Sequence, residues 1–200
     1  MPEIGGEVGK ERSLGALLKT GQTTQYEGYL DDGYYHKGLS KQYTVLTLGQ
    51  YSLTTNITVN GKTDAHSNNC VYDQRTKLMW SRYVSGSVGP GSDGKLPWTT
   101  NGNGEGIFAY VAAANAAKLG GYSDWKIPNI FELESLQHLE VPKGIPDATA
   151  FPTWDLAGYT WSSTTLPQFI THALGVYFRA GRGATDEKIV NWFACLVRGG

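Results

Sequence analysis

The stretch at residues 120–136, GGYSDWKIPNIFELESL, fixes where one helix has to end and where another has to begin. Gly120 and Gly121 form a helix stop, because glycine enters the left-handed conformation that closes many helices. Asn129, followed three residues later by Glu132, matches the capping box that opens a helix. Any fold of this chain must therefore turn sharply between two helices near residues 121–128.

Apolar residues at helical spacing lie on both sides of this turn. The spacing predicts one helix upstream of residue 120 and a second helix that begins at Asn129 and ends before Pro142. The residues that carry the two buried stripes are Ile107, Tyr110, Val111 and Ala114, and then Ile130, Leu133 and Leu136.

The residues between the helices, YSDW, favour a structural role. Asp124 is suited to accept backbone N–H bonds in the tight turn, and Trp125 is large enough to plug a junction between helices and sheet. The alternative is that Asp124 or Trp125 contacts a ligand. We expect a corner brace.

Strand patterns occupy most of the remaining chain. Residues 43–63 are rich in Thr, Val and Tyr, with Asn60-Gly61 as a hairpin signal, and the pattern at residues 68–83 predicts two strands joined by a turn at 74–77. Further strands are predicted within 158–165, 172–183 and 188–200, and the last has apolar residues on both faces, as a doubly covered central strand does. The order of strands, two helices and strands predicts an α+β class with antiparallel sheets.

Composition narrows the classes of partner. The net charge is -1 and only 18% of residues are charged, so nucleic acid is not an expected partner. No apolar run approaches the roughly 20 residues that a membrane span needs, so no membrane insertion is expected. The first residues lack the apolar core of a signal peptide, which leaves a removed signal or export without one. With 26 Gly, 12 Tyr and 6 Trp, the chain resembles an extracellular binding domain.

Two cysteines, Cys70 and Cys195, lie far apart in strand-like segments. If they pair, closing a loop of roughly 125 residues would stabilise the fold by about 4–5 kcal/mol. The alternative is two buried free thiols. We take the disulfide as the expectation, and no metal site is expected because neither cysteine has a Cys or His at ligand spacing.

Several motifs in a fixed order resemble the Lcl C-terminal domain family. Residues 120–136 are similar to its core, GGxxDWR(L/I)PxxxELxSL, and CVYDQRTKLMW at 70–80 is similar to its VxDxxTGLMW opening, with Lys77 where glycine is usual. YTWSSTT at 159–165 and FACLVRGG at 193–200 resemble its later strands. Upstream, 17–38 resembles the TGQT…DDG…KG leader of many bacterial members.

This resemblance implies a C-type-lectin-like fold for residues 67–200, preceded by a β-rich N-terminal extension at 1–66. It also implies a non-catalytic ligand-binding or receptor-binding protein outside the cell, on a cell surface or on a phage particle. Relatives include the variable proteins of diversity-generating retroelements, whose C-terminal face is hypervariable, as well as glycan-binding adhesins. Some members are trimeric, so a homo-oligomer is compatible with the resemblance.

The candidate ligand-binding residues lie between the motifs at 159–165 and 195–200. There, surface-directed positions mix apolar, aromatic and Arg side chains, as the centre of an interface does, whereas a solvated loop is more uniformly polar. We expect part of the 85–106 loop to join them. The predicted residues are Leu166, Pro167, Gln168, Ile170, His172, Tyr177, Arg179, Arg182, Asp186, Lys188 and Asn191.

Other functions are disfavoured by what the sequence lacks. The alternative of a fixed-specificity glycan-binding adhesin remains open, but the Glu-Pro-Asn and Trp-Asn-Asp triplets of calcium-dependent lectins are absent. No nucleophile elbow or phosphate-binding glycine loop is present, and the four histidines are scattered, so no enzyme activity and no cofactor are expected. Trp80, Trp125, Trp161 and Trp192 are assigned to the scaffold, whereas Trp98 and Trp154 are left open.

Overall fold

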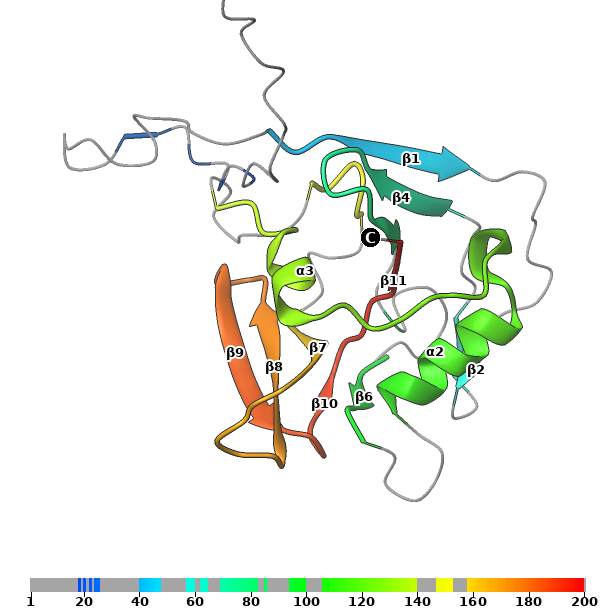
Figure 1. Cartoon of the computed structure of the whole chain (residues 1–200), viewed down its shortest axis with the longest axis vertical. Coiled ribbons are helices and arrows are strands. Elements are labelled where there is room, and N and C mark those ends of the chain that lie inside the picture. The colour runs from blue at the N-terminus through cyan, green and yellow to red at the C-terminus, as the bar shows by residue number, and fades with distance from the viewer. Residues whose placement is uncertain are drawn as a thin grey trace, which may run out of the picture.

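Figure 1 shows the computed structural model of the chain, which describes residues 18, 20, 22, 24–25, 40–47, 57–59, 62–64, 69–82, 85, 94–99, 106–139, 147–152 and 158–199. Most of the predicted extension at 1–66, most of the 85–106 loop, and Trp154 lie outside these residues. No helix in the described part of the chain is long and apolar enough to cross a membrane.

The largest sheet has four antiparallel strands in the order β1-β4-β5-β11. Its strands are β1 (Tyr43–Thr47), β4 (Asn69–Asp73), β5 (Met79–Ser81) and β11 (Val197–Arg198). The turn predicted at 74–77 joins β4 to β5, and the Asp73 carboxylate holds it by accepting bonds from Arg75 N (2.8 Å) and the Thr76 hydroxyl (2.8 Å). The predicted strands at 43–47 and 69–81 are therefore confirmed.

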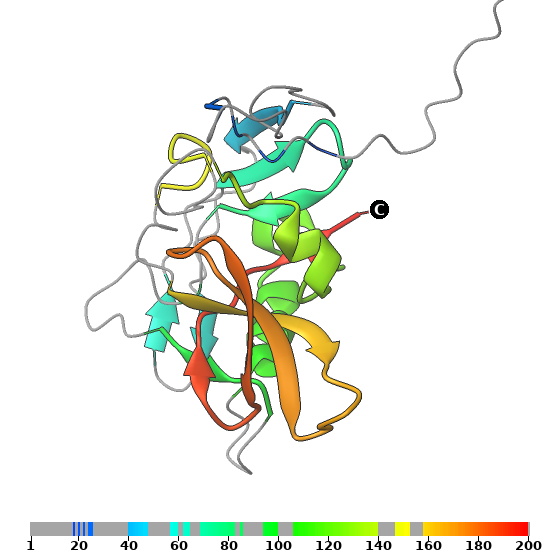
Figure 2. The same ribbon diagram turned by 90° about the vertical axis from the view of Figure 1, so that its left-hand side faces the viewer.

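A three-stranded antiparallel sheet lies beside α3 and below the first sheet, as Figure 2 shows in orange and gold. Its order is β7-β8-β9, built from β7 (Tyr159–Thr165), β8 (His172–Tyr177) and β9 (Arg182–Glu187). The other strands of the described residues form two small antiparallel pairs: β6 (Leu96–Pro97) with β10 (Asn191–Trp192), and β2 (Ile57–Val59) with β3 (Lys62–Asp64). The β2–β3 pairing, with Val59 opposite Lys62, confirms the predicted hairpin.

The two predicted helices are present as α2 (Ile107–Ala116) and α3 (Ile130–Glu134), with a short 3-10 turn, η1 (Leu119–Gly121), between them. Asn129 and Glu132 form the predicted capping box in full. The second helix is shorter than expected and ends well before Pro142. The Ser135 hydroxyl binds the Glu132 carbonyl at 2.6 Å, and Leu136 N bonds Leu133 O in a tighter final turn.

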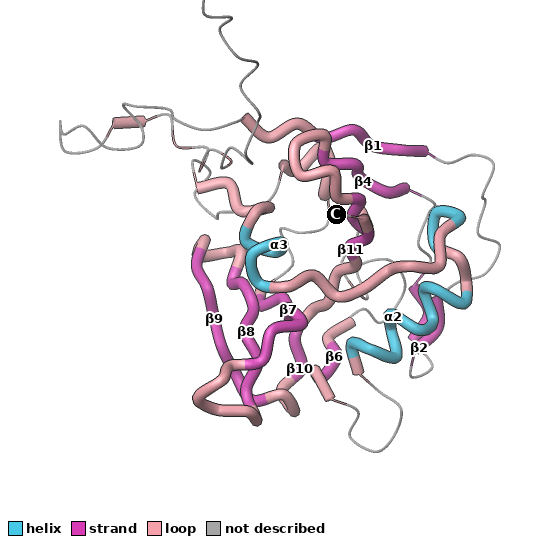
Figure 3. The backbone as a smooth tube through the Cα atoms, viewed as in Figure 1, coloured by secondary structure: helices cyan, strands magenta, loops and turns pink. Residues whose placement is uncertain are grey.

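The expectation of one central strand in 188–200 is wrong. Residues 193–196, which join β10 to β11, are buried as predicted but do not form a continuous strand (Figure 3): Phe193 makes a single bridge to Thr160 of β7, and residues 194–196 belong to no strand. Two serine hydroxyls accept the backbone bonds that a neighbouring strand would otherwise accept: Ser85 Oγ from Ala194 N (2.8 Å) and Ser81 Oγ from Leu196 N (3.0 Å). The apolar residues on both faces of this segment therefore indicated correctly that it is buried, but not that it is one strand.

The prediction of a disulfide is wrong. Cys70 and Cys195 are both free thiols, and both are fully buried. Each thiol belongs to a different core cluster: Cys70 packs with Trp125 and Trp161, and Cys195 packs with Trp80 and other residues beneath α3. Burial raises the pKa of Cys70 to about 12 and raises the pKa of Cys195 well above its usual value. Both cysteines thus act as apolar core residues.

Two hydrophobic clusters hold the layers together. One lies around α2 and contains the predicted scaffold residues Trp125, Trp161 and Trp192, while the other lies around α3 and contains Trp80. All four tryptophans are at most 5% exposed, so their assignment to the scaffold is confirmed.

Candidate functional site

The corner at residues 120–125 is braced by Trp125, as predicted. This side chain is only 2% exposed, and its indole N–H donates to the carbonyl of Leu119 at 2.9 Å. Asn115 of α2 bonds both backbone groups of Trp125, accepting from its N–H at 2.8 Å and donating to its carbonyl at 2.9 Å. The corner is therefore structural, and Asn115 is the anchor that the sequence did not reveal.

Asp124 does not serve mainly as an acceptor for the amides of the turn, contrary to expectation. Its carboxylate forms a two-pronged pair with Arg198 of β11, at 2.6 Å to Nε and 3.1 Å to Nη2. The guanidinium also lies 3.6 Å from the centroid of the Tyr122 ring. The stretch that opens the chain's second helix thus also fastens the C-terminal strand, and the Arg198 hydrogen bond lowers the pKa of Asp124.

Replacing Asp124 with asparagine should remove a small, pH-dependent stabilisation. Because the pKa of Asp124 is lowered on folding, its contribution is present above the unfolded pKa of about 3.9 and is lost as the pH falls through the folded pKa. The Asp124 side chain is 58% exposed to solvent, which screens the interaction, so we expect about 0.2–1 kcal/mol at pH 7. Urea unfolding of both proteins at pH 7 and below pH 3 measures this difference, and an undiminished difference at low pH would contradict the assignment.

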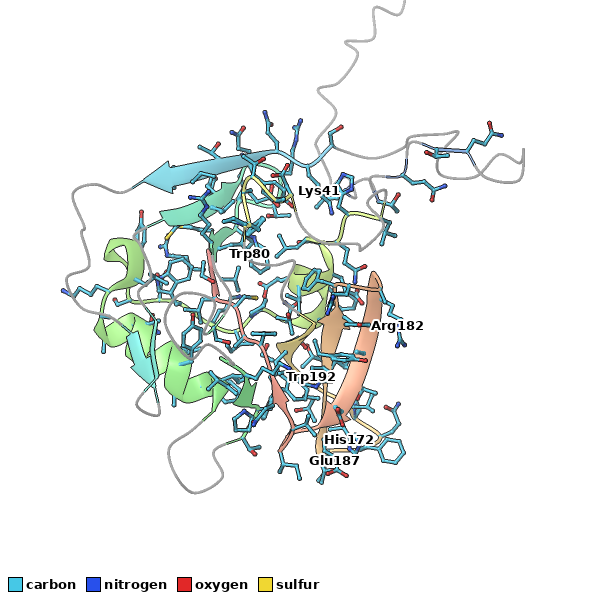
Figure 4. All side chains as sticks on the ribbon, turned by 180° about the vertical axis from the view of Figure 1, so that it is seen from behind. Lys41, Trp80, His172, Arg182, Glu187 and Trp192 are labelled. Atoms are coloured by element: carbon cyan, nitrogen blue, oxygen red, sulfur yellow. The ribbon has the colours of Figure 1, made fainter. Side chains whose placement is uncertain are left out.

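The eleven predicted ligand-binding residues fall at opposite ends of the β8–β9 hairpin. Strand pairing places His172 opposite Glu187 at one end and Tyr177 opposite Arg182 at the other. Five strand steps of about 3.3 Å separate the two ends by roughly 17 Å. Figure 4 shows His172 and Glu187 together, with Arg182 at the far end of the strand. The residues therefore form two groups, with Asp186 on β9 beside the His172 end.

The group at the Tyr177 end is tied to the scaffold. Tyr177 is half-buried and stacks on Tyr159 with ring centroids 4.3 Å apart. Tyr159 stacks in turn on Trp192 at 4.7 Å, and Trp192 stacks on Trp161 at 4.0 Å. Tyr177 thus ends a column of four aromatic rings that starts in the core, whereas Arg179 and Arg182 are exposed.

An open depression of about 480 Å³ lies between α3 and the β8–β9 hairpin. Its lining includes Ile130 and Glu134 of α3, Tyr159, and Arg182 and Gly183 of β9. The volume is within the range of small-molecule sites. Of the predicted residues, Arg182 alone lines it.

The group at the His172 end carries the most exposed apolar side chains of the described C-terminal segment. Phe169, Ile170 and Ile189 are 61%, 76% and 62% exposed. Ile170 and Ile189 each adjoin one partner of the bond from Lys188 N to Thr171 O (2.9 Å), so both lie in turns at this end of the hairpin. We call this surface the distal patch and define it by Pro167, Gln168, Phe169, Ile170 and Ile189.

The loop beneath the distal patch is closed by its own backbone bonds. Leu166 N bonds His172 O at 3.0 Å, Phe169 N bonds Leu166 O at 3.1 Å, and His172 N bonds Phe169 O at 2.8 Å. The exposed side chains therefore stand on a loop with a defined shape.

Lys188 and Trp98 connect this loop to the core. Lys188 Nζ donates to Thr165 Oγ1 at 2.9 Å and lies 4.1 Å from the centroid of the Trp98 ring. Trp98 in turn donates its indole N–H to Ser162 O at 2.8 Å and meets Phe108 edge-on at 4.8 Å. The predicted participation of the 85–106 loop thus rests on Trp98, since most of that loop lies outside the described residues.

Three residues of this region were missing from the sequence prediction: Phe169, Ile189 and Phe108. Phe169 and Ile189 each adjoin a predicted residue and are apolar within turns, which is the signal that could have identified them. Phe108 is on α2 and reaches the region only through tertiary packing with Trp98. Asn191 is exposed on β10, as predicted.

Ionisable side chains do not gather into a metal site in the described ranges, where no three His, Cys, Asp or Glu residues could share an ion. His172 Nδ1 lies 3.0 Å from the Thr171 hydroxyl, its neighbour in the chain. His36 and His66 lie outside the described residues.

The described chain is thus an α+β domain of mostly antiparallel sheets with two helices, closed by a buried C-terminal segment. It belongs to the Lcl C-terminal domain family, whose match covers residues 69–198, from the start of β4 to the end of β11. No curated protein and no solved structure is significantly similar to the chain. The C-type-lectin-like fold therefore stays a prediction from the resemblance.

Proposed function

We propose that this protein is a non-catalytic recognition protein that binds a ligand on a cell surface through the distal patch. The observation that carries the proposal is the exposure of Phe169, Ile170 and Ile189 on a hydrogen-bonded loop. Clusters of exposed apolar side chains mark interaction sites in soluble proteins, since the removal of apolar surface from water on binding is favourable. A loop already held in one shape also loses little conformational entropy on binding.

A protein ligand fits this surface better than a glycan. The two isoleucines and Phe169 offer an apolar centre, with Gln168 and Asn191 as exposed polar neighbours in the segment. This arrangement of an apolar centre and a polar rim is typical of protein interfaces. A fixed-specificity glycan-binding adhesin remains the second candidate, in which Phe169 would stack on a sugar ring.

The finer proposal is that the segment at 166–191 varies, as in the variable proteins of diversity-generating retroelements. In the sequence, the residues of the distal patch lie between β7 and β10. The buried residues Trp161 of β7 and Trp192 of β10 belong to the core. Side chains such as Ile170 can therefore change without altering the scaffold. A reverse-transcriptase gene with a near-duplicate of this segment beside the gene would support the proposal, and their absence would favour a fixed adhesin. The protein would act on a cell surface or on a phage particle.

The double substitution Phe169→Ala with Ile170→Ala tests the distal patch. Binding of the purified protein to an array of surface proteins and to a glycan array should fall at least about tenfold, because central apolar contacts carry most interface energy. The melting temperature should hardly change, since both side chains are exposed.

Arg179→Ala is the matched control for this test. Arg179 is exposed on the turn at the opposite end of the hairpin, so its loss should leave binding intact. Binding that survives the double substitution but disappears in the Arg179 variant would place the ligand at the Tyr177 end and overturn the proposal. Protein hits and glycan hits on the two arrays would separate the two candidate ligand classes.

A further inference from the structure

Strand β9 is an open edge of the three-stranded sheet. The strand order is β7-β8-β9, and no strand of the described chain pairs with the outer side of β9, which lies at the outside of the molecule in Figure 1. An unpaired strand edge presents a row of backbone donors and acceptors that another strand can join.

The direction of these backbone groups follows from the hairpin. Because Lys188 N donates to Thr171 O, the antiparallel alternation turns the N–H and C=O groups of Ala184 and Asp186 toward β8. The corresponding groups of Gly183 and Thr185 therefore point outward. Glu187 N is already bonded to the Asp186 carboxylate at 2.9 Å, so the free part of the edge is centred on Ala184.

Common protections against edge pairing are absent from β9. The pairing with β8 runs without a shift from His172–Glu187 to Tyr177–Arg182, so no bulge twists the edge away. The strand, RGATDE, contains no proline. The small residues Gly183 and Ala184 at its centre place no bulky side chain in the way of a pairing strand. The remaining protection is charge, from Arg182 at one end and from Asp186 and Glu187 at the other.

The charges of β9 are complementary to those of a second β9. In an antiparallel two-fold pairing centred on Ala184, Gly183 lies opposite Thr185 of the second copy, so the outward groups of both residues meet. Arg182 then lies directly opposite Asp186 of the second copy, and the symmetry repeats this ion pair. Shifting the register by two residues in one direction places Arg182 opposite Lys188, which is repulsive, and in the other opposite Ala184, which is neutral. The charge pattern thus selects one register.

We propose that two copies of this chain associate through β9 in this register and form a continuous six-stranded sheet. The two-fold axis passes through the Ala184 pair, where two small side chains meet. Since the strands run antiparallel, the two distal patches face opposite ends of the joined sheet. The dimer thus presents two copies of the proposed binding surface, although its formation does not depend on what the distal patch binds.

Sedimentation equilibrium of the full chain over a range of concentrations tests this dimer. Arg182→Asp and Asp186→Arg should each raise the dissociation constant by at least about tenfold, because each substitution replaces two attractive pairs with two repulsive ones. The double variant Arg182→Asp with Asp186→Arg should restore association, since the ion pairs re-form with their signs exchanged. Melting temperatures of all variants report whether each protein is folded.

Thr185→Pro supplies an independent block. It removes an outward N–H, together with the bond from the Thr185 hydroxyl to Ala173 O (3.2 Å). The backbone bonds from β9 to β8 come from Arg182, Ala184 and Asp186 and stay in place, so the variant should fold and association should be abolished. A chain that stays monomeric at all concentrations would overturn the proposal. So would a dimer that both charge reversals leave intact, or one that the charge-swapped double variant fails to restore.

Discussion

Replacement of Trp125 by alanine lowers the free energy of unfolding by about 3–5 kcal/mol, the range for removing a large buried aromatic side chain. The side chain is 2% exposed and belongs to the cluster that contains Ile107, Tyr110 and Trp161. Its loss leaves a cavity where α2, the corner and the sheets meet. Urea unfolding followed by circular dichroism gives the difference directly.

Trp125→Phe separates packing from hydrogen bonding at the same site. Phenylalanine retains much of the apolar contact but loses the indole N–H that bonds Leu119 O. That variant should therefore lose only about 1–3 kcal/mol, the cost of an unsatisfied buried group together with a smaller cavity. Near-neutral unfolding of the alanine variant would show that the corner is not braced by this residue.

The elements predicted correctly from the sequence are those that local chemistry determines. Asn129 and Glu132 are three residues apart, and their capping box depends on nothing beyond the first helical turn. The hairpin at 57–64 and the turn after Asp73 likewise depend on short-range bonds. Such signals do not require knowledge of which distant segments meet.

The errors arose where segments distant in sequence determine the structure. Residues 194–196 interrupt the predicted strand, because Ser81 and Ser85, more than a hundred positions earlier, accept their backbone bonds. Asp124 pairs with Arg198, which lies 74 positions later. The two cysteines sit in different clusters, which no spacing in the sequence could indicate.

The candidate site also depends on segments that are distant in the sequence, so its arrangement could not be predicted. Composition marked the segment at 166–191 as unusual, but only the hairpin register separates His172 from Tyr177 by the length of a strand. The register also determines which of the predicted side chains can act together. It places Ile170 and Ile189, which are nineteen positions apart in the sequence, at the same end of the hairpin.

The aromatic column explains why the hairpin can hold an exposed loop steady. Four rings stack from Trp161 through Trp192 and Tyr159 to Tyr177, at centroid distances of 4.0, 4.7 and 4.3 Å. This packing fixes β8 against the core, so the loop between β7 and β8 starts and ends on rigid strands. Damage to the column should therefore reach the whole hairpin.

Gly175 is the position where the column is most sensitive. A Cβ at this residue would overlap the carbonyl oxygen of Thr160 in β7 and lie 2.8 Å from a ring carbon of Trp192. Neither neighbour is the free end of a flexible side chain, so the backbone of β7 or the buried tryptophan has to shift. Gly175→Ala should cost about 3 kcal/mol, at the upper end of overpacking effects.

Gly183→Ala is the matched control for Gly175→Ala in the same hairpin. A Cβ at Gly183 meets only the Glu134 carboxylate oxygen, at 3.6 Å, which is ordinary contact. We expect unfolding to be unchanged or slightly stabilised there, since alanine restricts the unfolded chain more than glycine does. Thermal melting of both variants compares them under one condition. Equal melting temperatures would show that β8 does not approach β7 and Trp192 as closely as the aromatic column requires.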